Sequence, residues 1–170
     1  MFENIKNLDE KILLKISKIR KPFLDKIMVF ITRLGNTGLI WVFFSILFFT
    51  LFNNKRCAFK IVACLFLAGF LGEIVIKTLV GRIRPSKEIS QEKLLIRKPR
   101  TYSFPSGHTS SSFASALIIS TEYPAFLVPV FALALLIAFS RLYLKVHYPS
   151  DVLAGAVLGV LCSAFVYFLI

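Results

Sequence analysis

The chain has 170 residues, enough for one domain. It is 56% hydrophobic with a mean hydropathy of +0.74, which is more apolar surface than a soluble domain of this size can bury. The formal net charge is +12, but the Lys and Arg residues lie in blocks that flank nearly uncharged apolar runs. Because the aromatic residues lie inside these runs, the pattern argues against nucleic-acid binding and favours contact with anionic lipid headgroups.

The N-terminal segment, residues 1–36, predicts an amphipathic interfacial region. Apolar side chains recur at helical spacing, with mostly Lys, Asp, Glu and Asn between them. This pattern is typical of a helix that lies on a membrane surface, and a helix packed on the rest of the protein has the same pattern. Residues 23–34 form a second stretch, half apolar and shorter than the about 20 residues needed to cross a bilayer. The apolar positions of the first stretch are Phe2, Ile5, Leu8, Ile12, Ile16 and Ile19.

Five apolar segments follow in a transmembrane domain that we assign to residues 37–170. A long polar loop, residues 81–105, separates the second segment from the third. We therefore expect an all-α integral membrane protein: a bundle of about five transmembrane helices with an N-terminal amphipathic interfacial helix. The expected spans are residues 37–52, 57–80, 106–122, 124–144 and 149–170.

Ionisable residues beside or inside the spans are few and grouped, and a charge in such a position indicates function because it is costly there. Counting the crossings brings the end of the second span, the start of the third, the end of the fourth and the start of the fifth to one membrane face. Glu73 lies deeper, where it either pairs with Lys77 one helical turn away or contacts another polar group. The residues that converge are Lys77, Arg84, Ser106, Gly107, His108, Arg141, His147 and Asp151.

The residue types in this cluster suit phosphoryl transfer. His108 and His147 are the two histidines of the chain, and a neutral imidazole is a competent nucleophile and acid or base near pH 7. Lys and Arg side chains bind phosphoryl oxygens. Gly107 opens a helix whose free N–H groups point at an anion. Asp151, four positions after His147, can accept a hydrogen bond from the ring and fix its tautomer.

The same residues argue against a metal or other cofactor. Two-metal phosphatases need several carboxylates around their cations. Of the nine Asp and Glu residues, we expect only Glu73 and Asp151 near the cluster. Three cysteines lack the spacing of metal ligands and are expected in the core. We therefore expect no metal and no cofactor. The cysteines are Cys57, Cys64 and Cys162.

Three segments of the second half of the chain carry a resemblance to a known family. They run from Lys77 to Arg84-Pro85, from Pro105 to His108, and from Ser140-Arg141 to Asp151. Their order and spacing resemble the three-part motif of the type 2 phosphatidic acid phosphatase superfamily, over about residues 70–170. The resemblance implies metal-independent hydrolysis of a lipid phosphate or lipid diphosphate. Undecaprenyl diphosphate, phosphatidylglycerol phosphate, phosphatidate and lipid A phosphates all remain open as substrates.

The resemblance also implies a role for each residue of the cluster. His147 would attack phosphorus to form a phosphohistidine, with Asp151 orienting its ring. His108 would protonate the leaving group and then activate water. The motif leaves Arg82 unassigned, and a plain interfacial Arg is the simpler interpretation. The phosphate would be held by Lys77, Arg84, Ser106, Gly107 and Arg141.

Three other functions compete with a phosphatase. A lipid phosphotransferase would use the same residues, with a lipid hydroxyl in place of water. The superfamily also includes vanadate-dependent haloperoxidases, which resemble soluble helical proteins, so five apolar spans argue against that activity. A non-catalytic anion transporter would need neither both histidines nor the Ser-Gly turn.

Two arguments about orientation in the membrane conflict. The active-site face carries eight Lys and Arg residues in residues 1–36 and seven in residues 82–104, which the positive-inside rule places in the cytoplasm. The resemblance to bacterial cell-envelope phosphatases implies an outward-facing site in a multi-pass cell membrane. Because catalytic and substrate-binding cations weaken the charge rule, we expect the outward orientation.

Overall fold

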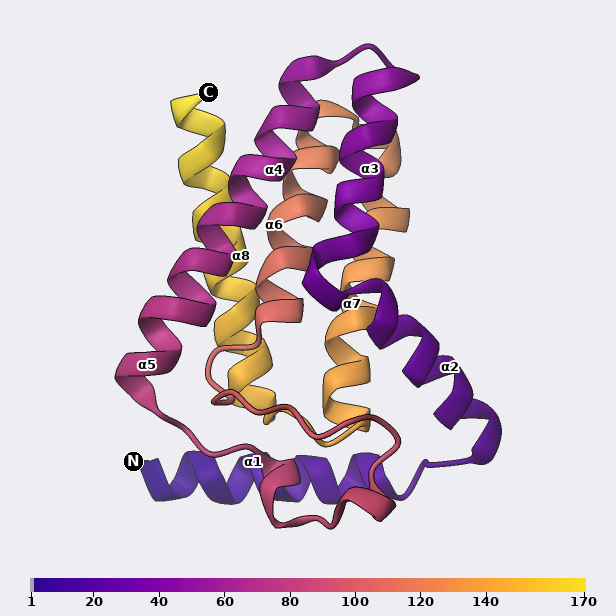
Figure 1. Ribbon diagram of the computed structural model, residues 1–170, viewed down its shortest axis with the longest axis vertical. Helices are drawn as coiled ribbons and strands as arrows, with labels where there is room; N and C mark the ends of the chain where they lie inside the picture. Colours follow the sequence, from indigo (N-terminus) through magenta and orange to yellow (C-terminus); the bar gives the residue numbers. More distant parts are fainter. Residues whose placement is uncertain (1) are drawn as a thin grey trace.

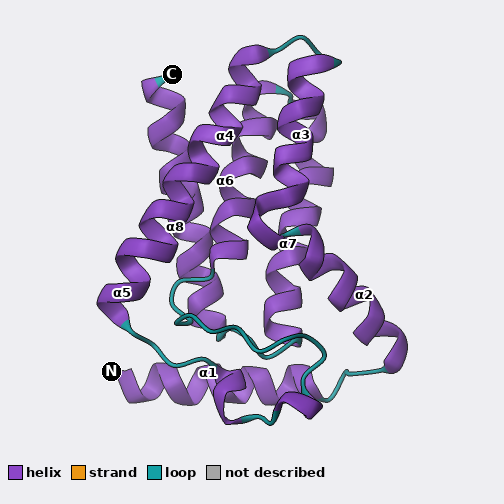
Figure 2. Cartoon of the chain, viewed as in Figure 1, coloured by secondary structure: helices purple, strands orange, loops and turns teal. Residues whose placement is uncertain are grey.

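All regular elements of the described chain are helical (Figure 2). The structure, a computed structural model, describes residues 2–170, apart from the side chains of Phe2 and Glu88. The prediction of an all-α membrane protein is confirmed. The elements are α1 (Phe2–Ser17), α2 (Pro22–Leu34), η1 (Asn36–Gly38), α3 (Leu39–Thr50), α4 (Lys55–Gly69), the π-helix η2 (Phe70–Ile76), α5 (Lys77–Val80), η3 (Pro85–Glu88), η4 (Gln91–Lys93), α6 (Gly107–Glu122), η5 (Pro124–Phe126), α7 (Leu127–Tyr143) and α8 (Pro149–Leu169).

Three helices are long and apolar enough to cross a membrane, namely Lys55–Val80, Pro124–Tyr143 and Pro149–Leu169. A fourth candidate is the pair α2 and η1–α3, bent by 51°. With 12 residues, α3 alone is roughly 18 Å long, too short for a hydrocarbon core of about 30 Å. The predicted span 37–52 therefore reaches a spanning length only when α2 continues it, whereas the hydropathy pattern predicted two separate segments.

The remaining predicted span, α6, is the central helix of the bundle, in contact with α4, α7 and α8, while α3 packs on α4 (Figure 1). Small residues let α8 approach it closely. A Cβ atom added at Gly155 would lie 2.6 Å from the carbonyl oxygen of Ser106, and one at Gly159 would lie 2.4 Å from that of Ser110. The α6–α8 contact thus fixes the first turns of two helices that carry predicted site residues.

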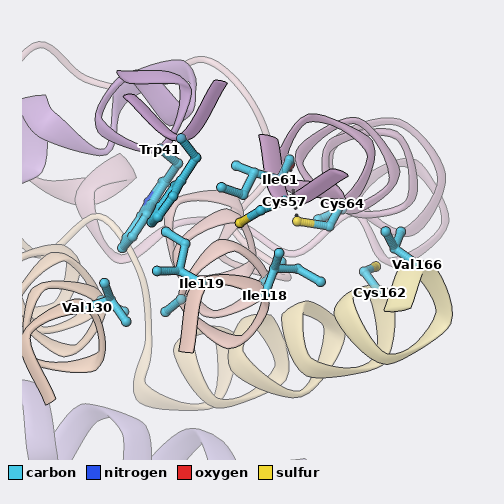
Figure 3. Packing of buried hydrophobic residues seen from close by; sticks show 14 of the residues in the cluster. Trp41, Cys57, Ile61, Cys64, Ile118, Ile119, Val130, Cys162 and Val166 are labelled. Atoms are coloured by element: carbon cyan, nitrogen blue, oxygen red, sulfur yellow. Dashed lines mark hydrogen bonds between the residues drawn. The ribbon is translucent and has the colours of Figure 1, made fainter. Parts of the chain in front are cut away.

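A hydrophobic core lies between α3, α4, α6, α7 and α8, and Figure 3 shows part of it. Trp41 is fully buried there, and its indole N–H donates to Ser112 Oγ at 3.0 Å. The three cysteines are buried and free, as expected of core residues. The outer side of the bundle exposes large apolar side chains such as Phe66 and Phe168. Such a surface suits contact with lipid.

Helix α1 lies across the end of the bundle, against the ends of α7 and α8 (Figure 1). It buries Asp9 and Leu13 and exposes Ile5, Leu8 and Leu14. The helix therefore packs on the protein and also presents apolar side chains outward. Its position on a membrane surface stays a prediction.

Candidate active site

One large cavity opens at the end of the bundle that α1 covers, with a volume of about 1110 Å³. It lies between the α2–α3 break, the long loop and the ends of the spanning helices. Seven of the nine predicted site residues line it, while Ser106 and Asp151 lie behind its wall. The seven are Glu73, Lys77, Arg84, Gly107, His108, Arg141 and His147.

Lys77 enters the cavity where the π-helix η2 gives way to α5. A π-helical turn departs from the regular α-helical register and is frequent at functional sites. The Lys77 ammonium lies 2.5 Å from Oε1 of Glu73. Of the two roles that the sequence left open for Glu73, the structure therefore gives it the contact with Lys77, which holds the ammonium at the cavity wall.

His147 lies in the turn between α7 and α8 and is 1% exposed. Its Nε2 is 2.9 Å from Nη1 of Arg84, on the cavity side. Its Nδ1 is 3.6 Å from Oδ2 of the fully buried Asp151. Burial, and then the positive charges of Arg84, Arg141 and Lys77, lower the pKa of His147 well below its usual range. This lowered pKa favours the neutral imidazole, the form that can act as a nucleophile.

The side chains of Arg84 and Arg141 are held in place by hydrogen bonds to neighbouring oxygen atoms. Arg84 donates to the carbonyl oxygens of Val146, at 2.8 Å, and Thr101, at 2.7 Å. Burial lowers the pKa of Arg84, but a guanidinium stays charged near neutral pH. Arg141 donates to Oγ1 of Thr32, and its Nε has no hydrogen-bond partner among the described residues. A buried donor without a partner is a candidate for binding a ligand oxygen.

His108, in the first turn of α6, is held by the break between α2 and α3. Its Nε2 lies 2.9 Å from Oδ1 of Asn36. A Cβ atom added at Gly35 would lie 2.9 Å from Cδ2 of His108 and 2.8 Å from Cγ2 of Ile137, so only glycine allows this approach. The amphipathic pattern of residues 1–36 predicts only an interfacial segment and gives no sign of this contact. Gly35 and Gly38, which interrupt the apolar pattern, are the sequence signal for the break.

Gly107, at the start of α6, lines the cavity. The proposed role of the N–H groups at this helix end needs such a position. A Cβ atom at Gly107 would lie 2.1 Å from Oε1 of Glu73. Ser106 is fully buried behind it. The Ser106 hydroxyl accepts a hydrogen bond from Thr109, and its N–H donates to the Asp151 carbonyl oxygen at 3.0 Å. Ser106 therefore joins the starts of α6 and α8, and its side chain does not line the cavity.

The interpretation of Arg82 as a plain interfacial residue is wrong. Its Nη1 donates to Oδ1 of Asp151 at 2.7 Å, and its Nη2 donates to Oδ2 of Asp9 at 2.7 Å. Burial by itself lowers the pKa of Arg82, but the hydrogen bonds to Asp9 and Asp151 and the negative charges of these two carboxylates outweigh it, so the pKa is raised. The sequence offered no signal for this bridge, because the two carboxylates are far from Arg82, and from each other, along the chain.

No cluster of three or more His, Cys, Asp or Glu residues that could hold a metal ion occurs in the described part of the chain. Lys77, Arg84 and Arg141 bring positive charge to the cavity that Glu73 offsets only in part. A cavity of this composition suits an anion with several oxygens.

The fold and the cavity define a helical, multi-pass membrane protein with two histidines and three cations at one end of its bundle. Residues 57–170 match the model of the PAP2 superfamily. The chain therefore belongs to the PAP2 superfamily, the family that the three sequence segments resemble.

Two curated relatives are each 31% identical to the chain. An undecaprenyl-diphosphatase of Sulfolobus acidocaldarius matches over 80% of this chain and 66% of its own length. A lipid A 4'-phosphatase of Bacteroides thetaiotaomicron matches over 94% of this chain and 75% of its own length.

Two solved structures share the fold. The transmembrane PAP2-type phosphatidylglycerolphosphate phosphatase of Bacillus subtilis superposes with a TM-score of 0.80 at 25% identity, covering 98% of this chain and 86% of that one. LpxE of Aquifex aeolicus superposes with a TM-score of 0.79 at 29% identity, covering 95% of each chain.

Proposed function

We propose that this membrane protein is a lipid phosphatase that hydrolyses a lipid phosphate monoester or a lipid diphosphate, without a metal ion, at the cavity described above. The observation that carries the proposal is the convergence of His108 and His147 with Lys77, Arg84 and Arg141 on one cavity. Relatives named as lipid phosphatases with three different lipid substrates support the lipid phosphatase class.

His147 is the proposed nucleophile, with Nε2 as the proposed attacking atom. Nε2 faces the cavity beside Arg84, whereas Nδ1 faces the Asp151 carboxylate. Attack by Nε2 forms an N–P bond and breaks the bond from phosphorus to the lipid oxygen. The ring becomes positively charged, and Asp151 stabilises this charge through the Nδ1 proton.

His108 is the proposed acid and base. It donates a proton to the departing lipid oxygen and then takes one from the water that attacks the phosphohistidine. The second step breaks the N–P bond and releases inorganic phosphate, which returns His147 to its neutral form and His108 to the protonated form that donates in the next turnover. Asn36 holds the His108 ring for both transfers through its contact with Nε2.

Charge stabilisation is assigned to Lys77, Arg84 and Arg141. Phosphoryl transfer depends mainly on positioning and on stabilising charge that spreads over three phosphoryl oxygens. These three side chains replace the divalent cations of a two-metal phosphatase, and Glu73 aims the ammonium of Lys77. The N–H groups at Gly107, at the start of α6, add donors without charge.

Two kinds of surface around the cavity support a lipid phosphate as substrate. Leu65, Leu94 and Leu95 provide apolar wall, which suits the first part of a lipid tail. Arg33 and Lys98 also line the cavity, outside the predicted phosphate site. They suit a second phosphate or an anionic headgroup, and they leave lipid diphosphates and lipid phosphate monoesters as substrates.

Phosphate release by the purified protein in mixed micelles tests this function. We expect hydrolysis of at least one lipid among undecaprenyl diphosphate, phosphatidylglycerol phosphate, phosphatidate and a lipid A phosphate. Activity is expected to persist in excess chelator, because the cations at the site are side chains, and to be inhibited by vanadate, a mimic of five-coordinate phosphorus. Loss of activity in chelator with recovery on added magnesium would contradict the metal-free mechanism.

The proposed orientation places the cavity on the extracytoplasmic side of the membrane. Lys93 and Lys55 are exposed at opposite ends of the bundle, and the native cysteines are buried. In a cysteine-free background, an impermeant thiol reagent is expected to label Lys93→Cys but not Lys55→Cys in intact cells, and both after permeabilisation. Labelling of Lys55→Cys alone in intact cells would place the cavity in the cytoplasm, as the charge distribution suggests.

A further inference from the structure

Asp9, on α1, is joined to the proposed catalytic carboxylate by an unbroken chain of hydrogen bonds. The Asp9 side chain is 4% exposed. Its Oδ1 accepts from the backbone N–H of Ser150 at 2.9 Å, and its Oδ2 accepts from the Ser150 hydroxyl at 2.5 Å. Asp9 therefore caps the first turn of α8, the turn that carries Asp151, from a helix far away in the sequence.

Arg82 connects the two carboxylates. Its Nη2 donates to Asp9, and its Nη1 donates to both Ser150 Oγ and Asp151 Oδ1, each at 2.7 Å. The guanidinium carbon also lies 4.2 Å from the centre of the Tyr148 ring. With the guanidinium held on three sides, the position of Oδ1 of Asp151 is fixed.

The other oxygen of Asp151 is left for His147. Oδ2 accepts from the backbone N–H of Tyr148 at 2.8 Å and faces Nδ1 of His147 at 3.6 Å. Arg82 alone would draw the negative charge of Asp151 away from the imidazole. Because Asp9 shares the charge of Arg82, more of the Asp151 charge remains to stabilise a positively charged ring.

We propose that Asp9 and Arg82 are positioning residues for the reaction: they set the place and the effective charge of Asp151, and through it the orientation of His147. The inference rests on the proposed function, since it requires Asp151 and His147 to act together. Neither Asp9 nor Arg82 lines the cavity, so we assign them no direct contact with the substrate.

The test is a double-mutant cycle between Asp9 and Asp151, with an aryl phosphate as a soluble substrate. Asp9→Asn keeps an acceptor for the Ser150 N–H but removes the charge. We expect a fall in kcat of about tenfold, with KM changed less than about twofold, since residues in one hydrogen-bond network typically couple by such a factor. In an Asp151→Asn background, the same substitution is expected to change kcat by less than about twofold.

Arg82→Gln is the second variant and is expected to show the same dependence on Asp151. Glu10→Gln is the matched control, because Glu10 lies next to Asp9 on α1 and, among the described residues, its ion pair is the exposed one with Lys6 at 4.0 Å. It is expected to leave kcat unchanged. Thermal unfolding of each variant confirms that the compared proteins are folded.

Equal losses from Asp9→Asn in both backgrounds would overturn the inference, because α1 would then act only on the stability of the fold. Unchanged kcat in Asp9→Asn would also overturn it. If Asp151→Asn by itself leaves kcat unchanged, the proposed function of the His147–Asp151 pair fails and the inference fails with it. A loss that disappears in the Asp151→Asn background supports the inference.

Discussion

His147→Gln is expected to lower the rate of lipid phosphate hydrolysis by at least about 10³-fold, the scale of loss seen when a nucleophile is removed. Gln places a polar atom near Arg84 but cannot form a phosphorylated intermediate. Because the phosphate would still meet Lys77, Arg84 and Arg141, we expect binding of inorganic phosphate, measured as competition with a labelled ligand, to change far less than the rate. Initial rates with the lipid found active in the substrate panel provide the measurement.

Lys145→Gly is the control for this substitution. Lys145 lies in the same turn, two residues before His147, and has a positive φ of 56°, which glycine adopts without strain. Lys145 does not line the cavity. The hydrolysis rate of Lys145→Gly is therefore expected to stay within about twofold of that of the parent protein. Activity of folded His147→Gln within tenfold of the parent would rule out His147 as the nucleophile.

His108→Gln is expected to lower the hydrolysis of a lipid phosphate by about 10²–10⁴-fold, the usual contribution of a positioned acid or base. The loss in the first chemical step should depend on the leaving group. An aryl phosphate with an acidic phenol needs no proton on its leaving oxygen, so its first step should be nearly normal. The second step, attack by water, should remain slow with either substrate. A burst of phenol followed by slow turnover is therefore expected.

Ser111→Ala is the matched control for His108. Ser111 lies on the next turn of α6, lines the same cavity and donates to the His108 carbonyl oxygen at 3.1 Å. We expect it to show neither the burst nor the large loss. Equal losses of His108→Gln on the lipid and on the aryl phosphate, without a burst, would show that His108 does not act as the acid.

The sequence predicted the helical fold and most of the residues that line the cavity, because both depend on short-range patterns. Apolar runs of spanning length define α4–α5, α7 and α8, and the spacing of Lys77, Arg84 and His108 within the motifs identifies residues that line the cavity. Counting the crossings of the membrane was enough to bring these residues to the same end of the bundle, because each span reverses the direction of the chain.

The supporting residues could not be predicted, because their contacts join distant parts of the chain. Asn36 reaches His108, and Thr32 reaches Arg141, across 72 and 109 positions. Asp9 reaches Ser150 across 141 positions. These three residues all lie in the amphipathic segment 1–36, whose composition predicts only a position at the membrane interface.

The bent pair α2 and α3 shows a second limit of the sequence. Gly35 and Gly38 end the apolar pattern locally, so hydropathy divides one bent pair into a non-spanning stretch and a short span. In the structure the same break brings Thr32, Gly35 and Asn36 to the cavity. The break between α2 and α3 therefore lies next to residues that support the site. A second departure from regular α-helix, the π-helix η2, directly precedes Lys77.

Trapping of the phosphorylated protein tests the central claim most directly. Purified protein is mixed with a lipid substrate labelled with ³²P in the reacting phosphate, quenched in base and separated by electrophoresis. A phosphohistidine is stable in base and labile in acid, so we expect label on the protein that survives base, disappears in acid, increases in His108→Gln with an activated substrate, and is absent from His147→Gln. Label that persists in His147→Gln, or an active protein that never carries label in either background, would contradict a phosphohistidine at His147.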